Sequence, residues 1–504
     1  MRTLCLTLLS STSLLLASGA LAQTVDQAGA DALEAQVPAI LDFIFQSAPN
    51  VSFDFDGEVE AVPDGDRYDV SIPAITIDTN GDVDIAIPPF AAEVTPQDNG
   101  WQRAQWDFPG SIAITNPRDS SDRADITFSS NDNDMTFAPE YGMALQADVG
   151  LSDMSITVQD REGSITVEQL DMAVDTEPSG ASEHSYDSET AATLENLRIN
   201  IPTEEVLLQV EAVELTGTSA RQRLDLFASL QQRIEGLDPE SEEFLTGFVE
   251  VLRDNAGEKW IGDASYGMTL DGLSFTIEDV SGSLGAFGLS MTATDLDEPA
   301  AQLGLVVDLE EITTTDVPPQ FAQLIPTRAD FDLLTVDAPI EAISDQLYGY
   351  LGEAPSDEEL FGPKGRRAGV GNPMANLQNI DPMEFLGILM GSEVEVLLQD
   401  FFVEADIGYV AAEGTIQPDA QAALQATADL DLQIAGLPEM IAFAQQMGGE
   451  AADGAAFVSV LAAMGRDATD DDGRDIKEFD LELTQAGQVL LNGNDMSAMV
   501  GMFQ

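Results

Sequence analysis

Side chains suited to acid–base or nucleophilic chemistry are scarce in this sequence, apart from the carboxylates. His184, in the segment ASEHSYDSE, is the only histidine, and Cys5 is the only cysteine. Serines and Tyr186 lie near His184, but no serine occupies the Gly-x-Ser-x-Gly turn that exposes a nucleophile in many hydrolases. A zinc or iron site with several histidine or cysteine ligands is excluded. We therefore expect His184 to lie in a surface loop.

Carboxylates dominate the charge of the chain. There are 91 Asp and Glu residues against 19 Lys and Arg residues, for a net charge of −72. Two carboxylates can hydrolyse a glycosidic bond, but so many are present that no pair stands out. The negative charge excludes nucleic acid as a partner. It is typical of the solvated surface of exported proteins from marine or halophilic bacteria, because salt at about 1 M screens the repulsion.

One acidic segment, DATDDDGRD, looks at first like a calcium loop. If Gly473 takes the sixth position of an EF-hand, then Ala468 takes the first and Phe479 the twelfth, where acidic ligands are required. The motif therefore fails. Weak Ca²⁺ binding by this loop, or by the NDND segment at residues 131–134, is the remaining metal hypothesis, and we expect no other cofactor.

The backbone elements that would position any site follow an alternating pattern. In the segment 150–176, apolar residues alternate with polar ones on both sides of a turn, which predicts a β-hairpin. The alternation slips by one residue at Glu168–Gln169, as a bulge or a strand break would require. The same alternation continues in the segment YGMTLDGLSFTIEDV. The apolar positions of these two segments are Met154, Ile156, Val158, Ile165, Val167, Leu273, Phe275 and Ile277.

Most of the chain shows the same alternation of apolar and polar residues, so the predicted fold class is mainly β (α+β). We expect long, twisted antiparallel sheets, curled or repeated, with capping helices and a helical hairpin. The triplet Tyr-Gly-Met occurs at Tyr141 and again at Tyr266, which favours a repeated β unit. The polar segment 177–190 is predicted to be an exposed loop.

Changes in pattern along the chain predict five regions. A basic Arg2, an apolar run and the ending Ala20-Leu21-Ala22 indicate a signal peptide at 1–22. An N-terminal helix and an antiparallel β region then occupy 23–218, and a helical hairpin with a second β region occupies 219–356. A linker at 357–382 contains the basic segment GPKGRRAGVGNP, which could alternatively contact an anionic lipid headgroup. A β/α region at 383–504 completes the chain.

The signal peptide predicts export to the periplasm, with secretion as the alternative. Once it is removed, no apolar stretch is long enough to span a membrane. The exported part also lacks cysteine, so its stability must come from a large core rather than from disulfides.

The C-terminal region carries a family resemblance. The segments VAAEGTIQPDAQAALQATADLDLQIAGLPEMI, AAFVSVLAAMG and FDLELTQAGQVLLNG resemble uncharacterised periplasmic envelope proteins of alphaproteobacteria, which carry only a domain-of-unknown-function label. These families are similar in pattern to larger envelope proteins whose curved sheets hold lipid in an apolar groove. The resemblance implies a periplasmic location and no known activity.

Together, these features favour a non-enzymatic envelope protein. The eight apolar positions named above would line a groove for a lipid-like or other apolar ligand, because the expected helices are too few and too short to cover the sheet. The alternative is a structural or protein-interaction module of the periplasm, whose apolar face is fully covered. A hydrolase that uses carboxylates alone is the third hypothesis. Alternation by itself does not separate the first two, since a covered core and an open groove share it.

Overall fold

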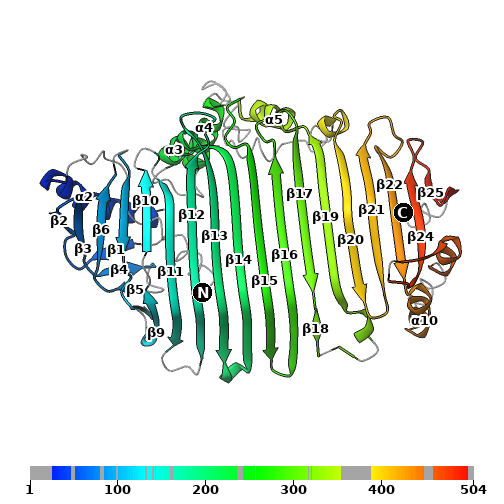
Figure 1. Cartoon of the computed structure of the whole chain (residues 1–504), viewed down its shortest axis with the longest axis horizontal. Coiled ribbons are helices and arrows are strands. Elements are labelled where there is room, and N and C mark those ends of the chain that lie inside the picture. The colour runs from blue at the N-terminus through cyan, green and yellow to red at the C-terminus, as the bar shows by residue number, and fades with distance from the viewer. Residues whose placement is uncertain are drawn as a thin grey trace, which may run out of the picture. The chain divides into compact units, whose positions relative to one another are not determined.

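A computed structural model describes the backbone of residues 25–46, 52–79, 84–97, 100–116, 119–130, 133–138, 141, 143–158, 163–234, 242–255, 257–315, 317–318, 321–352, 387–447, 458–470 and 472–497. The predicted signal peptide and linker lie outside these ranges. Within them the chain is mainly β, with antiparallel strands, as predicted (Figure 1). No helix among the described residues is long and apolar enough to cross a membrane.

The chain divides into two compact units. The first unit comprises Met1–Gly262 and Leu347–Asn379, and the second comprises Asp263–Gln346 and Ile380–Gln504. The sequence-based boundary near residue 219 precedes the helical hairpin, whereas the boundary between the compact units follows it. The hairpin helices therefore belong with the strands that come before them.

The sheet of the first unit has two branches that meet at one long strand, β11 (Met143–Val158). The later half of β11 pairs with β9 (Asp119–Ser130), and the first half pairs with β10 (Asn133–Ala138). Beyond β9, the first branch continues through β8 (Ser111–Asn116), β5 (Asp84–Ile87), β4 (Ile75–Asp78) and β1 (Ser52–Phe55). Beyond β10, the second continues through β7 (Gln102–Trp106), β6 (Phe90–Pro96), β3 (Arg67–Ile72) and β2 (Glu60–Asp64).

The other edge of β11 continues into a meander of long strands, β12 (Ser164–Pro178), β13 (Ser185–Ile201) and β14 (Val206–Arg223). The predicted loop at 177–190 is therefore wrong for most of its length, because the strand pairing of β12 and β13 extends as far as Pro178 and Tyr186. The hydroxyl groups of Thr176 and Ser188 hydrogen-bond to each other at 2.8 Å. Polar partners of this kind allow strands to continue without apolar alternation.

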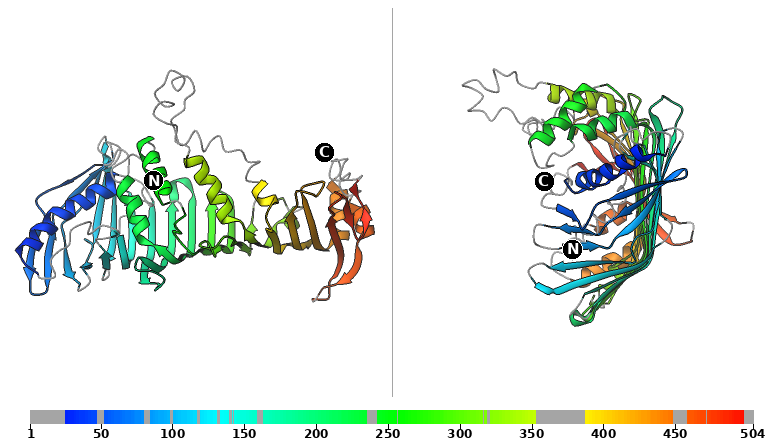
Figure 2. Two further views of the ribbon diagram at one scale, coloured as in Figure 1. Left: turned by 90° about the horizontal axis from the view of Figure 1, so that it is seen from above. Right: turned by 90° about the vertical axis from the view of Figure 1, so that its left-hand side faces the viewer.

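Helix α2 (Gln27–Gln46) fills the space between the two branches, which confirms the predicted N-terminal helix. Leu33 and Val37, one helical turn apart, are almost completely buried beside Tyr68 of β3, Ile77 of β4 and Trp106 of β7. Figure 2 shows α2 inside the curve of these strands. This end of the first unit therefore has a closed core.

The predicted helical hairpin is present as α3 (Leu224–Ile234) and α4 (Glu242–Asp254). Asp225 lies in the first turn of α3 and Arg233 in its last turn, where each charge interacts favourably with the helix dipole. The two helices approach closely at Gly247, where an added Cβ would lie 3.2 Å from the carbonyl oxygen of Arg233. Figure 1 shows both helices at the ends of the long strands rather than across their middle.

The second unit is built on a longer meander. Its main strands are β15 (Asp263–Ile277), β16 (Val280–Thr294), β17 (Ala301–Glu310), β19 (Pro326–Ala338), β20 (Glu395–Ala405), β21 (Gly408–Pro418), β22 (Ala426–Ala435) and β24 (Asp475–Leu483), and each pairs with the next in this order. Short strands β18 (Thr313–Thr314), β23 (Arg466–Thr469), β25 (Val489–Leu491) and β26 (Asn494–Asp495) pair along this sheet. Helices α5 (Ile340–Gly352) and α10 (Leu437–Met447) follow β19 and β22.

Interruptions of the alternation occur at matching places on neighbouring strands. Asp153 of β11 has a left-handed backbone, with φ 51°, and the pairing of β11 with β12 passes over Asp153 and Glu168 together. This is the phase slip that the sequence predicts at Glu168. Leu151 and Met154 can therefore contact the same apolar cluster although they are three residues apart. Gly272 of β15, with φ 63°, is passed over in the same way in the second unit.

Candidate functional site

The predicted groove residues of the first unit do lie together. Met154 is paired with Val167 and Ile156 with Ile165 across β11 and β12. Val167 is only 4% exposed, and Met154 and Ile156 pack against a cluster of buried residues, which are Ile112, Ile126 and Phe128. The side chain of Val158, at the end of β11, lies outside the described part. In this portion of the apolar face, Val167 is therefore core, and Met154, Ile156 and Ile165 are partly buried.

The remaining predicted positions, Leu273, Phe275 and Ile277, lie on β15 in the second unit. Phe275 is paired with Gly282 of β16, and its ring occupies the space that a side chain at 282 would need, since an added Cβ would lie 2.7 Å from the ring. Ile277 is 49% exposed. The two groups of predicted residues thus belong to separate units. Each group is mostly of intermediate exposure, with Val167 the buried extreme and Ile277 the exposed one.

The β15 residues begin an apolar face that crosses the whole meander of the second unit. Cross-strand pairing produces two continuous rows, which together define the apolar face. The first row is Leu270, Phe287, Leu309, Ala329, Val403, Val410, Ile434 and Lys477. The second row is Met268, Leu289, Val307, Phe331, Phe401, Ala412, Leu432 and Phe479.

Most of this face is only partly buried. From β15 to β21 the members of both rows have intermediate exposure, and beside them Tyr266, Met291 and Leu303 are 40%, 45% and 38% exposed. Helix α5 begins where β19 ends and lies at the strand ends in Figure 1. Among the described residues, the buried apolar cluster on this face involves only the strands β22, β24 and β25. A second cluster, which includes Tyr409 and Ile476, lies on the opposite face. The face is therefore open over several strands in the described structure.

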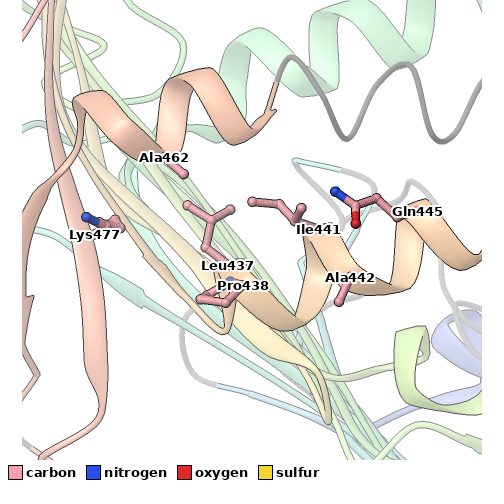
Figure 3. A pocket seen from close by; sticks show the side chains of 7 residues that line it. All are labelled: Leu437, Pro438, Ile441, Ala442, Gln445, Ala462 and Lys477. Carbon is pink, nitrogen blue, oxygen red and sulfur yellow. The ribbon is translucent and has the colours of Figure 1, made fainter.

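At its C-terminal end, by contrast, the face is covered. Leu437 and Ile441 of α10 pack with Phe479 of β24, and Leu461 and Ala462 come from the helical residues 458–464. Next to this cluster lies an open pocket of about 340 Å³. Its lining, shown in Figure 3, consists of Leu437, Pro438, Ile441, Ala442, Gln445, Ala462 and Lys477.

The opposite face of the same strands carries a line of acidic residues. Asp332 of β19 is paired with Asp400 of β20. Glu413 of β21 is paired with Asp431 of β22, and Asp431 is also paired with Asp480 of β24. We call this line of carboxylates the acidic ladder; its members are Asp332, Asp400, Glu413, Asp431 and Asp480. Like charges placed directly across strands repel each other, so the ladder opposes folding at neutral pH.

The pKa values of the ladder reflect this crowding. Burial, together with repulsion by neighbouring carboxylates, raises the pKa of Asp400. Burial and a hydrogen bond to Asp480 raise the pKa of Asp431. Asp480 behaves in the opposite way, because the hydrogen-bonded guanidinium of Arg466 lowers its pKa. A proton is therefore held more tightly at Asp431 than at Asp480.

Among the described residues, the side chains most suited to catalysis do not form a nucleophile–base pair. His184 is exposed in the turn between β12 and β13, as predicted, and its Nδ1 lies 2.9 Å from the hydroxyl of Tyr141. That hydroxyl is 3.4 Å from the hydroxyl of buried Tyr186. Ser185 is buried and hydrogen-bonded to Ser179 at 2.8 Å. The partner of His184 is thus a phenol rather than a serine.

The predicted calcium loops use polar side chains for hydrogen bonds within the protein. Asp470 accepts hydrogen bonds from the backbone N–H groups of Asp472 and Arg474 and from the hydroxyl of Tyr409. In the described part of the NDND segment, Asn133 bonds to the backbone of Trp106 and Gly150. No group of three acidic, histidine or cysteine side chains among the described residues is placed to hold a metal ion. Weak calcium binding stays a prediction.

Sequence reasoning missed both the acidic ladder and the pocket. The signal for the ladder is present, because Asp and Glu alternate with apolar residues in ADLDLQIA and KEFDLEL, which puts acids on one face and apolar side chains on the other. The pocket has no such local signal, since its residues come from α10, the helical residues 458–464 and β24.

No protein-family model, curated protein or solved structure matches this chain. Any function must therefore be argued from the residues themselves.

Proposed function

We propose that this chain is an exported, non-enzymatic envelope protein that binds a lipid-like ligand on the apolar face of its second unit. The observation that carries the proposal is the partial exposure of apolar side chains along both rows from β15 to β21. Apolar surface left in water costs about 25 cal/mol per Å². Contiguous apolar patches on a folded protein commonly mark a binding surface.

The dimensions of the face suit an acyl chain. The row from Leu270 to Lys477 crosses eight paired strands, so a strand spacing of about 4.8 Å gives a length of roughly 34 Å. Half of the hydrocarbon core of a bilayer is about 15 Å thick. An extended acyl chain of membrane length therefore fits along the row.

The alternative function is a structural or protein-interaction module whose apolar face is covered. The first unit favours it, because there Val167 shows the same alternation and is buried, and Met154 and Ile156 pack against buried core residues. In this alternative, a partner protein or another part of the chain would cover the face of the second unit in the same way.

A direct test is native mass spectrometry of the protein purified from its own envelope, followed by organic extraction. We expect a stoichiometric lipid in the wild type. Met291→Arg should reduce the bound lipid several-fold, because it places a charge among the exposed apolar side chains. Thr292→Arg is the matched control, since the adjacent residue points to the opposite face. A ligand-free mass, or equal loss in the two variants, would leave the covered module as the better function.

A further inference from the structure

Lys477 is the exception in the apolar face. The basic residues of the second unit are Arg328, Arg466, Arg474 and Lys477. The three arginines form ion pairs with carboxylates, with distances of 2.7 Å to Asp330, 2.5 Å to Asp480 and 2.8 Å to Glu404. Lys477 instead ends the first apolar row, where it is paired with Ile434.

The current polar partners of Lys477 are weak. Its ammonium group donates a long hydrogen bond of 3.5 Å to the carbonyl oxygen of Gly465. Its ammonium group lies 2.5 Å from the carboxylate of Asp467 on β23, and the side chain of Asp467 is 90% exposed. Ion pairs with such exposed groups contribute little, because water and salt screen them. The side chain of Lys477 is itself only 27% exposed. Little free energy is therefore lost when Lys477 exchanges Asp467 for another anion.

The pocket provides the apolar part of such a site. Leu437, Ile441 and Ala462 converge on its interior, and Figure 3 shows Lys477 to one side of them and Gln445 to the other. The volume of about 340 Å³ is at the small end of the range for ligand pockets. It suits one hydrocarbon chain rather than two.

We propose that this pocket binds a single-chain amphiphile with one negative charge, namely a fatty-acid carboxylate, whose head group pairs with Lys477. This inference rests on the proposed function and names the ligand class. The acyl chain lies among Leu437, Ile441 and Ala462, and a longer chain extends along the row through Ile434 and Val410. A carboxylate and an ammonium group form a charge-assisted hydrogen bond.

The charge of the protein argues for a singly charged ligand. At a net charge of −72, repulsion grows with each negative charge that the ligand carries. One lysine compensates one carboxylate. A phosphate-bearing lipid with several negative charges is repelled more strongly. The described part of the apolar face offers it no second basic residue to compensate the additional charges.

The proposal is tested by titration calorimetry of the full-length mature protein at 0.15 M NaCl, with dodecanoate and with uncharged dodecan-1-ol, both below their aggregation limits. We expect dodecanoate to bind about tenfold more tightly than dodecanol. Lys477→Met should abolish this preference, so that dodecanoate no longer binds more tightly than dodecanol. Lys259→Met removes the same charge from the first unit and is the matched control.

A second variant keeps the test decisive if Lys477→Met fails to fold, which far-UV circular dichroism would reveal. Asp467→Asn removes the exposed competitor of the ligand, so dodecanoate should bind severalfold more tightly while dodecanol does not change. Equal binding of the two ligands by the wild type, or a preference that survives Lys477→Met, overturns the fatty-acid proposal alone. Failure of both ligands to bind the wild type counts against this proposal and the proposed function together.

Discussion

Asp431 of β22 and Asp480 of β24 are directly paired on neighbouring antiparallel strands, and the hydrogen bond between them helps to separate their pKa values. Arg466 accounts for the asymmetry. Its guanidinium donates hydrogen bonds of 2.5 and 2.6 Å to Asp480, so the negative charge stays on Asp480. Asp431 lacks an ion-paired arginine of this kind in the described structure, and burial with the hydrogen bond to Asp480 raises its pKa.

Replacing Asp431 with asparagine should therefore stabilise the second unit at neutral pH. The raised pKa of Asp431 means that its stabilising, protonated form is fully present below the ordinary value of 3.8 and is lost as the pH rises through the raised pKa. We expect a gain of roughly 0.5 kcal/mol at pH 7, the scale of exposed cross-strand charge pairs, and no gain at pH 3. Urea denaturation at the two pH values measures it.

Asp495→Asn is a control for that experiment, because its effect on stability should have the opposite sign. Hydrogen bonds from the hydroxyl and the backbone N–H of Ser497 lower the pKa of Asp495. Its contribution is therefore present above 3.8 and is lost as the pH falls through the lowered pKa. This variant should be less stable than the wild type at pH 7. A loss of stability in both variants at pH 7 would contradict the account of the ladder.

Salt should stabilise the protein strongly. With a net charge of −72, the repulsion among carboxylates is screened as the Debye length falls from about 10 Å at 0.1 M to about 3 Å at 1 M salt. We expect the melting temperature to rise across this range in circular dichroism melts. A double variant with Glu413→Gln and Asp431→Asn should show a shallower rise. A flat series for the wild type would mean that the carboxylates are already compensated, and melts with a chelator would show whether bound calcium compensates them.

The core of the first unit depends on α2. Leu33 is 0% exposed, so Leu33→Ala should leave a cavity and lower the free energy of unfolding by about 3 kcal/mol. Val62→Ala, at a side chain that is 58% exposed on β2, should change it by less than about 0.5 kcal/mol. Equal effects of the two substitutions in denaturant titrations would argue against α2 as part of the core.

Gly414 tests the pairing of β21 with β22. Its φ is +146°, and a Cβ at this position would lie 2.1 Å from the carbonyl oxygen of Asp429. Gly414→Ala should destabilise the second unit by roughly 3 kcal/mol, because the backbone must shift. Gly387→Ala is the control, since no atom lies within 4 Å of its added Cβ. Unchanged stability of Gly414→Ala in thermal melts would show that the strand does not take this conformation.

The strands could be predicted from local pattern, but their burial could not. Val167 and Ile277 follow the same alternation, yet one is 4% exposed and the other 49%. The difference depends on which distant strands and helices cover each position, and periodicity carries no such information. The interruption of strand pairing at Glu168 could be predicted because it shifts the alternation of apolar residues in the sequence. The polar start of β13 was missed because its strand pairing relies on Thr176 and Ser188 rather than on apolar side chains.

The candidate site shows the same limit. The register that places Lys477 opposite Ile434 joins strands separated in sequence by α10 and by the helical residues 458–464. Alternation identifies Ile434 as an apolar-face residue, but it does not show that a lysine continues the row. Lys477 becomes part of the pocket only through the pairing of β24 with β22, which local sequence does not reveal.

The meander order of each unit affects how the chain can reach its fold. Successive long strands pair with their immediate predecessors, as β12 does with β11 and β16 does with β15, so each new hairpin can form as soon as its residues become available. A chain that emerges from a ribosome or a translocation channel N-terminus first can therefore add these long strands one after another. The two branches of the first unit differ, because β3 and β5 must wait for β6 and β8. During that process the newest strand always has an unpaired edge, and the dense negative charge of the chain would keep such edges from joining those of other copies.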